Sequence, residues 1–227
     1  MEVDAVILAR GGSRGIPRKN LIDFCGKPLI YWTIKQCLAS KYVREVWVSS
    51  DNIEILNLSA QFGAKTINRP TEISTNQSSS ESSWIHSVDY IEEKTGSSDL
   101  IIGPQVTSPL RETSDIDSAI EKFEKENCDS MFSCSTIDDI FLWKKSLNGK
   151  LIGANHDYLH RKRRQDMPAQ IVENGSFYLF KPSILKEYNN RLGGKISSIN
   201  MDYWKMFEID TWDDVRICSS LMKEFLL

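Results

Sequence analysis

Two consecutive segments decide the fold: VDAVIL at residues 3–8 and ARGGSRGIPRKN at residues 9–20. The first is a nearly continuous apolar run, which is typical of a strand buried on both faces of a parallel sheet. Comparable runs occur at Val46–Val48, Leu100–Ile102 and Met131–Phe132. The sequence therefore predicts a covered, mostly parallel sheet, and its first strand leads directly into a glycine-rich basic loop.

Helical spacing of apolar residues separates these strands. The expected helices cover Leu29–Ala39, Ile55–Phe62, Ile116–Phe123, and a final segment after Thr211 that carries Val215, Cys218, Met222 and Phe225. We expect Asp51 and Ser114–Asp115 to act as helix N-caps, and Pro182 to open a helix after the strand Phe177–Phe180. The serine-rich stretch Gln77–Ser83 is interpreted as one loop. Alternating strands and helices predict a three-layer α/β/α sandwich with a Rossmann-like sheet.

The regular alternation weakens between Thr136 and Ile171. Charged residues crowd this stretch, and Asn148-Gly149 is a strong signal for a hairpin turn. We interpret residues 136–171 as an insert within a single domain that spans residues 1–227.

Composition limits the functional classes. The chain has 227 residues, and its 28 Lys plus Arg against 31 Asp plus Glu give a formal charge of -3, so no general basic field favours nucleic acid. No apolar run is long enough to span a membrane, and no signal peptide is evident, so we expect a cytoplasmic protein without a membrane partner. The five cysteines contain no C-x-x-C pair and are expected to be small core residues.

The loop after the first strand suits a polyphosphate. Its three glycines let backbone N–H groups approach an anion, and Arg10, Arg14, Arg18 and Lys19 add four cations within ten residues. The spacing matches neither the P-loop motif nor the dinucleotide fingerprint. The alternative interpretation is a flexible, solvated basic loop.

These motifs together resemble a known family, the acylneuraminate cytidylyltransferases, which make CMP-sialic acids on the nucleotide-diphospho-sugar transferase fold. The resemblance spans nearly the whole chain. It rests on ordered blocks: Arg10-Gly11-Gly12-Ser13 with Gly15-Ile16-Pro17 and Lys19-Asn20, Gly26-Lys27-Pro28-Leu29-Ile30, Arg69-Pro70, Gln105 with Thr107-Ser108-Pro109-Leu110-Arg111, Arg164-Gln165-Asp166, Asn174-Gly175 with Tyr178, and Ile209-Asp210-Thr211 with Asp214.

The resemblance implies that the anomeric hydroxyl of a sugar acid attacks the α-phosphorus of CTP and releases pyrophosphate. Such a transfer needs positioning and charge neutralisation more than covalent chemistry. The implied catalytic residues are Lys19, Arg10 and Asp210. The implied nucleotide-binding residues are Arg10, Gly11, Gly12, Ser13, Lys19, Asn20, Arg69, Ser78 and Ser80.

An acidic pair is the candidate metal site. Glu208 and Asp210 alternate on an expected strand, so both carboxylates point to one face, as a hard cation such as Mg²⁺ requires. The resemblance makes them the metal ligands, although the family commonly has two aspartates here. The alternative is an acidic N-cap region for the last helix.

Two further segments have a role only through the resemblance. Arg69 with Ser78 and Ser80 is implied to meet the base and ribose, where Asn76 replaces the aspartate of many relatives. Taken alone, this serine-rich segment indicates a linker. Gln105 and Tyr178 are implied to bind the sugar, whereas Thr107-Ser108-Pro109 taken alone is equally consistent with a turn.

The densest charge cluster is Arg161–Arg164. Runs of this kind are usually solvated, but the resemblance assigns Arg164 and Gln165 to the sugar acid, since a guanidinium matches a carboxylate bidentately. It also makes residues 136–171 a dimerisation arm, so that Arg164 acts in the partner's site of a homodimer. His156 and His160 stand four apart with no evident carboxylate partner, and we expect no zinc site.

The sequence thus predicts a Mg²⁺-dependent enzyme whose substrates are CTP and a nonulosonic, sialic acid-like sugar acid. A CMP-3-deoxy-octulosonate synthetase is the nearest alternative. A noncatalytic nucleotide-sugar binding protein is an alternative of another class, and Glu208 in place of an aspartate keeps it open.

Overall fold

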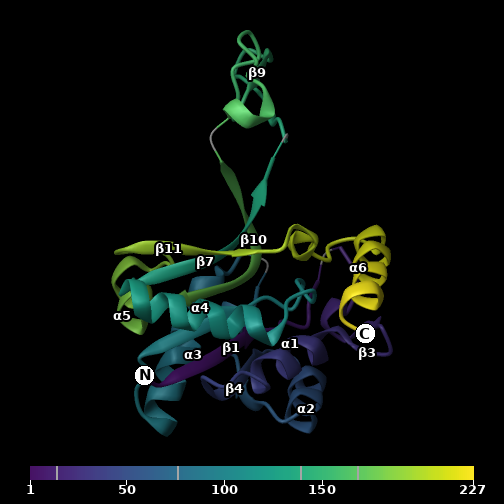
Figure 1. The fold of residues 1–227 in the computed structure, drawn as a ribbon. Helices are drawn as coiled ribbons and strands as arrows, with labels where there is room; N and C mark the ends of the chain where they lie inside the picture. Colours follow the sequence, from purple (N-terminus) through teal and green to yellow (C-terminus); the bar gives the residue numbers. More distant parts are fainter. Residues whose placement is uncertain (14, 76, 139, 168) are drawn as a thin grey trace.

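The computed structural model describes residues 1–13, 15–75, 77–138, 140–167 and 169–227; the side chain of Arg164 also lies outside the description. A seven-stranded sheet forms the centre of the molecule (Figure 1). In spatial order its strands are β11 (Ile196–Met201), β7 (Ser130–Ile137), β10 (Gln170–Phe180), β6 (Leu100–Pro104), β1 (Val3–Leu8), β4 (Val43–Ser50) and β5 (Lys65–Asn68).

Most neighbouring strands of this sheet are parallel. The pairs β1–β4, β1–β6, β4–β5 and β11–β7 are parallel, and β10 alone of the strands in this sheet runs antiparallel to its neighbours β6 and β7. The expected mostly parallel, Rossmann-like sheet is confirmed, and β1 has the predicted bounds. The carboxyl ends of β1, β4 and β6 meet at one edge of the sheet, which is where ligands bind in open α/β folds.

Helices cover both faces of the sheet, so the predicted three-layer sandwich is confirmed. Alternate residues of β1 point to opposite faces: Ala5 and Ile7 pack in one apolar cluster and Val6 packs in another. The first cluster includes residues of four helices, and the second includes residues of two. The first set is α1 (Leu29–Leu38), α2 (Ile53–Gln61), α4 (Thr113–Glu126) and α6 (Trp212–Phe225); the second is α3 (Ser80–Thr95) and α5 (Pro182–Tyr188).

Two of the expected helix caps are wrong by one to three residues. The N-cap of α2 is Asn52, whose side chain accepts from the N–H groups of Glu54 and Ile55, whereas Asp51 accepts from Gly11 N–H instead. Helix α4 begins earlier than expected, with Glu112 at the N-cap, and Asp115 accepts from the Glu112 N–H at 2.7 Å. Pro182 opens α5 and Thr211 caps α6, as predicted.

The serine-rich stretch is not a single loop. Ser80 begins the 16-residue helix α3, and Ser79 is its N-cap, with its hydroxyl accepting from Ser82 N–H at 3.2 Å. Trp84, Val88 and Ile91 form the buried stripe of this helix. Serine favours the first turn because its hydroxyl satisfies free N–H groups there, which explains a helix in a segment of loop-like composition.

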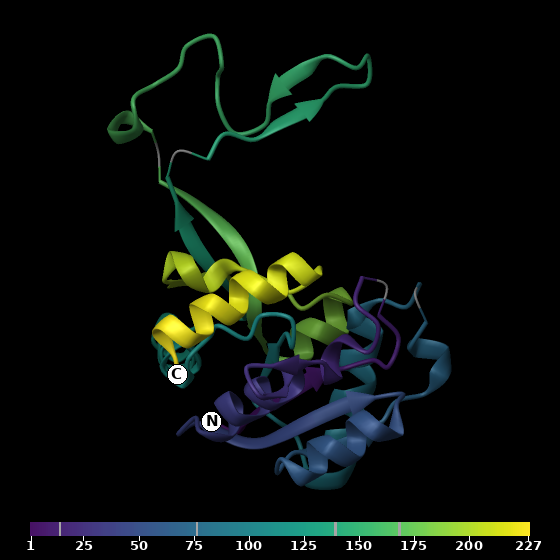
Figure 2. The ribbon, with the colours of Figure 1, turned by 90° about the vertical axis from the view of Figure 1, so that its right-hand side faces the viewer.

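An arm projects from the body where β7 ends and β10 begins (Figure 2). It contains a small hairpin of β8 (Trp143–Lys145) and β9 (Leu151–Gly153), so the predicted turn at Asn148-Gly149 is confirmed. Strand β10 extends further toward the arm than the expected Phe177–Phe180, because Gln170–Glu173 pair with Cys134–Ile137 of β7.

The acidic pair does not lie on a strand. Residues 207–209 have no regular secondary structure and connect the short helix η4 (Tyr203–Met206) to the start of α6. Ile209 N–H donates to Thr107 O at 2.8 Å. The expectation fails because, among the described residues, the segment forms this one backbone–backbone bond to the body and no strand ladder.

The remaining elements are short. They are η1 (Lys19–Leu21), β2 (Asp23–Phe24), β3 (Lys27–Pro28), η2 (Thr71–Ile73) and η3 (Arg164–Asp166). All five cysteines are free thiols, and four of them are buried, while Cys25 is partly exposed. Among the helices in the described residues, none combines the length and apolar character that a bilayer-crossing segment needs.

Candidate active site

The glycine-rich loop is tied to the end of β4. Gly11 N–H donates to Asp51 Oδ1 at 2.8 Å, and a Cβ atom on Gly11 would lie 2.9 Å from the Asn52 side chain, so a larger residue does not fit without a shift. Asn20 Nδ2 donates to Arg10 O at 2.9 Å and closes the loop. Gly12 and Ser13 follow Gly11 in the same loop, and Gly12 is exposed.

The cations predicted in this loop separate in the structure. Arg10 Nη1 donates to Thr75 O at 3.2 Å, while Arg18 forms an exposed ion pair with Glu54 on α2. Arg14 lies outside the described residues. The expectation that Arg18 adds to a four-cation phosphate site is therefore not supported by its contacts.

Lys19 joins the loop to the acidic segment. Its Nζ donates to Asp210 Oδ1 at 2.7 Å and to Ile209 O at 2.9 Å, and the Lys19 side chain is only 14% exposed. Gly15 packs on the same segment, because a Cβ atom there would lie 2.4 Å from Asp210 O. The loop and the residues around position 210 thus form one site from opposite ends of the chain.

A first cavity of about 310 Å³ lies beside the loop. The buried Arg69 lines it, and its Nε donates to Ser74 Oγ at 3.0 Å. Burial lowers the pKa of the Arg69 guanidinium from its ordinary value. The lining residues are Leu8, Arg10, Arg69, Ile73, Ser74, Thr75, Ser78, Ser79, Ser80 and Ser83. Arginines and hydroxyls of this kind bind polar ring edges and hydroxyl groups.

A second cavity of about 270 Å³ adjoins the first and shares Leu8 and Ser80 with it. It lies at the carboxyl ends of β1 and β6. Its lining residues are Leu8, Asn20, Ser80, Trp84, Pro104, Gln105, Val106, Thr107 and Arg191. Amide and hydroxyl groups dominate the polar part of this wall, as expected for a site that binds hydroxyl-rich ligands.

A buried arginine supports the backbone behind Gln105. Arg111 is 1% exposed, and its guanidinium donates to Gln105 O at 2.7 Å, Gln36 Oε1 at 2.9 Å and Ser176 O. Burial lowers the pKa of Arg111 to about 10. Because its donors are used by fixed acceptors, Arg111 holds the strand end that carries Gln105.

In the acidic pair, burial and the neighbouring charge disfavour the ionised form of Glu208. Burial and the neighbouring Asp210 carboxylate raise the pKa of Glu208 to about 7, against opposing effects of Lys19 and Arg111. A Cβ atom on Gly175 would lie 1.8 Å from Glu208 Oε1, so the carboxylate rests directly on this glycine, whose φ is +65°. Two crowded carboxylates gain from a divalent cation, and Mg²⁺ binds such oxygens.

The described residues include no group of three or more His, Cys, Asp or Glu side chains arranged to hold a metal. If Glu208 and Asp210 hold Mg²⁺, phosphate oxygens and water would have to complete the coordination, as is usual for this ion.

The structure gathers most of the candidate residues suggested by the sequence. Arg10, Arg69, Ser78 and Ser80 line the first cavity, and Asn20 and Gln105 line the second. Tyr178 is buried against Trp84, with ring centroids 6.3 Å apart, so it lies beside a wall of the second cavity rather than among the residues that line it. Gln165 is exposed on the arm, and it shares the short helix η3 with Arg164.

Sequence reasoning did not single out Trp84, Arg191 or the buried role of Arg111. Trp84 could have been found from its helical spacing with Val88 and Ile91. No local pattern marks Arg191, whose contacts come from α3 and β10.

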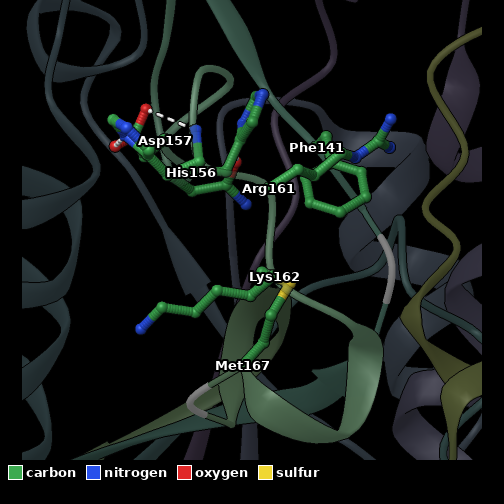
Figure 3. Close-up of a pocket in the computed structure, with 8 residues that line it drawn as sticks. Phe141, His156, Asp157, Arg161, Lys162 and Met167 are labelled. Carbon is green, nitrogen blue, oxygen red and sulfur yellow. Dashed lines mark hydrogen bonds and ion pairs between the residues drawn. The ribbon is translucent and has the colours of Figure 1, made fainter.

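The arm has a separate pocket of about 200 Å³, which Figure 3 shows. Arg161 stacks over Phe141, with 4.3 Å between the guanidinium carbon and the ring centroid. His160 Nδ1 lies 2.9 Å from Asp157 Oδ2, so the expectation that these histidines have no carboxylate partner is wrong for His160. His156 instead packs against Phe141 and Trp143.

A mostly parallel sheet with adjoining cavities, a basic glycine loop and an acidic pair at its carboxyl edge defines an α/β protein of the nucleotidyltransferase class. The model of the cytidylyltransferase family matches residues 5–210. The chain belongs to the cytidylyltransferase family, so the resemblance in the sequence is confirmed.

Individual relatives agree with this assignment. The chain is 35% identical over 226 residues to N-acylneuraminate cytidylyltransferase A of Danio rerio. The matched region covers 98% of this chain and 51% of that protein. It is 27% identical to a pseudaminic acid cytidylyltransferase of Campylobacter jejuni, covering 96% and 95% of the two chains. This chain thus spans about half the length of the first relative.

The fold is shared with a CMP:2-keto-3-deoxy-manno-octonic acid synthetase solved in complex with CTP. The TM-score is 0.74 at 17% sequence identity, and the match covers 100% of both chains.

Proposed function

We propose that the protein is a CTP-dependent cytidylyltransferase that converts a nonulosonic, sialic acid-like sugar acid to its CMP-sugar with release of pyrophosphate. The observation that carries this proposal is the pair of adjoining cavities, joined at Leu8 and Ser80, at the carboxyl edge of the sheet. The names of the relatives support the same reaction, since one is an N-acylneuraminate cytidylyltransferase and the other a pseudaminic acid cytidylyltransferase.

In this proposal the first cavity takes the cytidine. Arg69, Ser78 and Ser80 meet the base and ribose, and the N–H groups of Gly12 and Ser13 face the phosphates, while Gly11 fixes the loop through its bond to Asp51. Arg10 lines this cavity, and Lys19 of the same loop supplies a second cation toward the acidic segment. The second cavity takes the sugar acid, with the Gln105 amide as a neutral hydrogen-bonding group.

The transfer forms one P–O bond and breaks another. The anomeric oxygen of the sugar acid attacks the α-phosphorus of CTP, the pyrophosphate oxygen leaves, and the proton of the anomeric hydroxyl passes to solvent or a nearby carboxylate. Lys19 offsets the charge that grows on the leaving oxygen. Its present partner is Asp210, so triphosphate oxygens compete with this carboxylate for the ammonium group.

Glu208 and Asp210 would hold Mg²⁺. When bound, this ion neutralises phosphate charge during the transfer. The raised pKa of Glu208 fits such a site, because a cation relieves the repulsion between the two carboxylates.

The arm is proposed to form a homodimer and to place Arg164 and Gln165 at the partner's sugar site. Eight of the 19 exposed large apolar side chains among the described residues lie between positions 136 and 171. They are Leu142, Trp143, Leu147, Leu151, Ile152, Tyr158, Leu159 and Ile171. Exposed apolar residues concentrated on a projecting arm favour an interface, and a second copy of the chain is the occupant to which we commit.

The test is pyrophosphate release by the purified chain with Mg²⁺, comparing CTP with ATP, GTP and UTP against nonulosonic and octulosonic acids. We expect turnover with CTP and a nine-carbon acid. Preference for the eight-carbon acid would favour the octulosonate synthetase, and CTP binding without turnover would favour the noncatalytic alternative. Sedimentation velocity tests the dimer, and a fully active monomer would contradict the role of the arm.

A further inference from the structure

The segment that carries the acidic pair is held mainly by side chains. Residues 207–209 have no regular secondary structure, and among the described residues the bond from Ile209 N–H to Thr107 O is their one backbone–backbone tie to the body. On the side of the glycine-rich loop, Lys19 donates to Ile209 O at 2.9 Å and to Asp210 Oδ1 at 2.7 Å. The position of Glu208 and Asp210 therefore depends on side-chain anchors at the two ends of the segment.

The anchor at the other end is a buried lysine. Lys205 lies in η4, three residues before Glu208, and its side chain is only 3% exposed. Its Nζ donates to Glu112 Oε2 at 2.7 Å and to both carboxylate oxygens of Asp115 at 2.9 Å. A third carboxylate oxygen group, that of Asp202, lies 3.7 Å away. All the donor capacity of this ammonium group is directed at carboxylates of the protein itself.

The two main partners of Lys205 belong to a fixed part of the body. Glu112 is the N-cap of α4, and Asp115 accepts from the Glu112 N–H at 2.7 Å in a capping box. Arg111 directly precedes this cap and donates to Gln105 O at 2.7 Å. Lys205 thus ties the start of the acidic segment to the same helix end that supports the carboxyl edge of the sheet.

The bonds of Lys205 are better suited to fixing geometry than to adding stability. Burial opposes its charge, but hydrogen bonds to Glu112 and Asp115 outweigh burial and raise the pKa of Lys205, so the group is charged near neutral pH. A buried ion pair contributes little net stability compared with well-packed apolar residues, whereas its directional bonds restrict where the chain can lie. Lys205 contacts neither cavity of the candidate site.

Lys205 and Lys19 differ in what they can do when a nucleotide binds. The Lys19 side chain is 14% exposed and lies in the loop proposed to face the phosphates, so phosphate oxygens compete for its ammonium group. Lys205 is covered and already saturated with carboxylates, so its bonds persist. Once Lys19 turns toward phosphate, Lys205 is the ammonium group that still holds the segment.

We propose that Lys205 is a positioning residue, which holds the segment carrying Glu208 and Asp210 through its bonds to Glu112 and Asp115 and so keeps the two carboxylates in place for a divalent cation. It acts through the segment and touches neither the cation nor a substrate. The inference rests on the proposed function, and it deepens that function by assigning the support of the metal pair.

The test is Mn²⁺ binding by Lys205→Met, measured by electron paramagnetic resonance of free Mn²⁺ without nucleotide or sugar. We expect the Kd for Mn²⁺ to rise about 10-fold, since groups that orient metal ligands typically change metal affinity by 10- to 100-fold. The Mg²⁺ concentration that gives half-maximal pyrophosphate release should rise by a similar factor. The KM for CTP at saturating Mg²⁺ should stay within about 3-fold of the wild-type value.

The matched control is Arg44→Met. It also removes a cation from a buried carboxylate, that of Asp4, which lies in the amino-terminal part of β1, away from the ligand edge of the sheet. A general loss of stability should lower the melting temperature of both variants, but the Kd of Arg44→Met for Mn²⁺ should stay within about 2-fold of the wild-type value.

If Lys205→Met does not fold, Lys205→Arg decides. Arginine keeps the charge, but its planar, larger head cannot reproduce the same three bonds in a covered site, and the Kd for Mn²⁺ should rise about 5-fold. A Kd within 2-fold of the wild-type value in the folded variant, or an equal rise in Arg44→Met, would overturn the inference. It is overturned equally if the wild type binds no Mn²⁺, or if Asp210→Asn binds it as tightly as the wild type does.

The proposed function is tested separately, by pyrophosphate release from the wild-type protein with CTP and the panel of sugar acids. If no acid is turned over while Lys205→Met still weakens Mn²⁺ binding, the proposed reaction fails and the positioning role stands. If the wild type is active and Mn²⁺ binding is unchanged in the variant, the role of Lys205 is refuted and the proposed function stands.

Discussion

The carboxyl edge of the sheet and the projecting arm are built in opposite ways. At the edge, Arg111 and Arg69 are 1% and 5% exposed and donate to fixed oxygens of the body. On the arm, strands of three residues carry side chains such as Leu151, which is 59% exposed. The edge is thus organised within one chain, whereas the apolar surface of the arm has no cover within the described part of the chain.

This difference separates two kinds of substrate contact. Groups at the edge are positioned before any ligand arrives, which lowers the entropic cost of binding. Arg164 and Gln165 belong to the arm, so in our proposal their position depends on a second subunit. The comparison predicts that changes at the edge alter catalysis or stability in each chain, while changes on the arm act through association.

The largest expected effect is that of Lys19→Ala. Removing the ammonium should lower kcat by about 10²- to 10³-fold, as loss of a group that stabilises developing charge does in other enzymes. The free energy of unfolding should change by less than about 1 kcal/mol, because the Lys19–Asp210 pair is exposed on the Asp210 side. Steady-state pyrophosphate release and urea denaturation measure the two quantities.

The matched control is Lys186→Ala, which breaks ion pairs with Asp89 and Glu92 far from the loop in sequence and off the cavity walls. It should leave kcat unchanged. A Lys19→Ala enzyme with wild-type kcat would remove Lys19 from the chemistry and weaken the contrast between the two regions.

The next largest effect is expected from Arg111→Met. The substitution leaves several buried acceptors, among them Gln105 O and Ser176 O, without their donor. We expect a loss of about 3 kcal/mol in the free energy of unfolding. Chemical denaturation measures it, with Arg216→Met on the surface of α6 as the control that should cost less than about 0.5 kcal/mol. A loss no larger than that of the control would show that the edge is not held by Arg111.

Features set by local sequence were predictable. The apolar run at residues 3–8 is β1 with the expected bounds, and Thr211 caps α6 through the reciprocal bonds with Asp214 that the spacing permits. The loop at residues 9–20 lies at the ligand edge because parallel strands place the segment after β1 there. The hairpin at Asn148-Gly149 follows from turn chemistry alone.

Features set by distant contacts were not predictable in this way. Arg191 acquires its position from Glu81 and Tyr178, more than ten residues away in sequence, and no spacing rule reports such a contact. Glu208 and Asp210 were expected on a strand because they alternate, but alternation cannot show whether a neighbouring strand is available to pair. Ser80–Ser83 form a helix because tertiary packing of Trp84 overrides composition.

A smaller effect is expected from the double variant W143S/L151S on the arm. Both side chains are exposed, at 49% and 59%, and belong to the β8–β9 hairpin. We expect the dimer Kd to rise about 10- to 100-fold. The two substitutions remove apolar area from the interface, and this loss weakens association by about 1–3 kcal/mol. Sedimentation equilibrium measures the Kd.

The control for the arm is Ile217→Ser, a 45% exposed apolar residue on α6 of the body. It should leave the Kd unchanged. If both variants weaken association equally, or neither does, the arm has no special part in dimer formation and the comparison between edge and arm fails.

The smallest expected effect concerns the pH dependence of stability through Glu208. Burial and Asp210 raise the pKa of Glu208 to about 7 from 4.5, so the folded state binds this proton more tightly than the unfolded state. The stabilising contribution of protonated Glu208 is therefore complete below the pKa of the unfolded state and is lost as the pH rises through 7.

Glu208→Gln, which carries no titrating proton, should lose less stability than the wild type between pH 5 and pH 8. The difference in the free energy of unfolding should be about 1 kcal/mol after allowance for solvent screening. Denaturation of both proteins without divalent metal gives the difference, and Mg²⁺ should restore stability at pH 8 in the wild type more than in the variant. Identical pH profiles would mean that Glu208 is ionised without cost, and the acidic pair would then be a poorer candidate for a metal site than its crowding indicates.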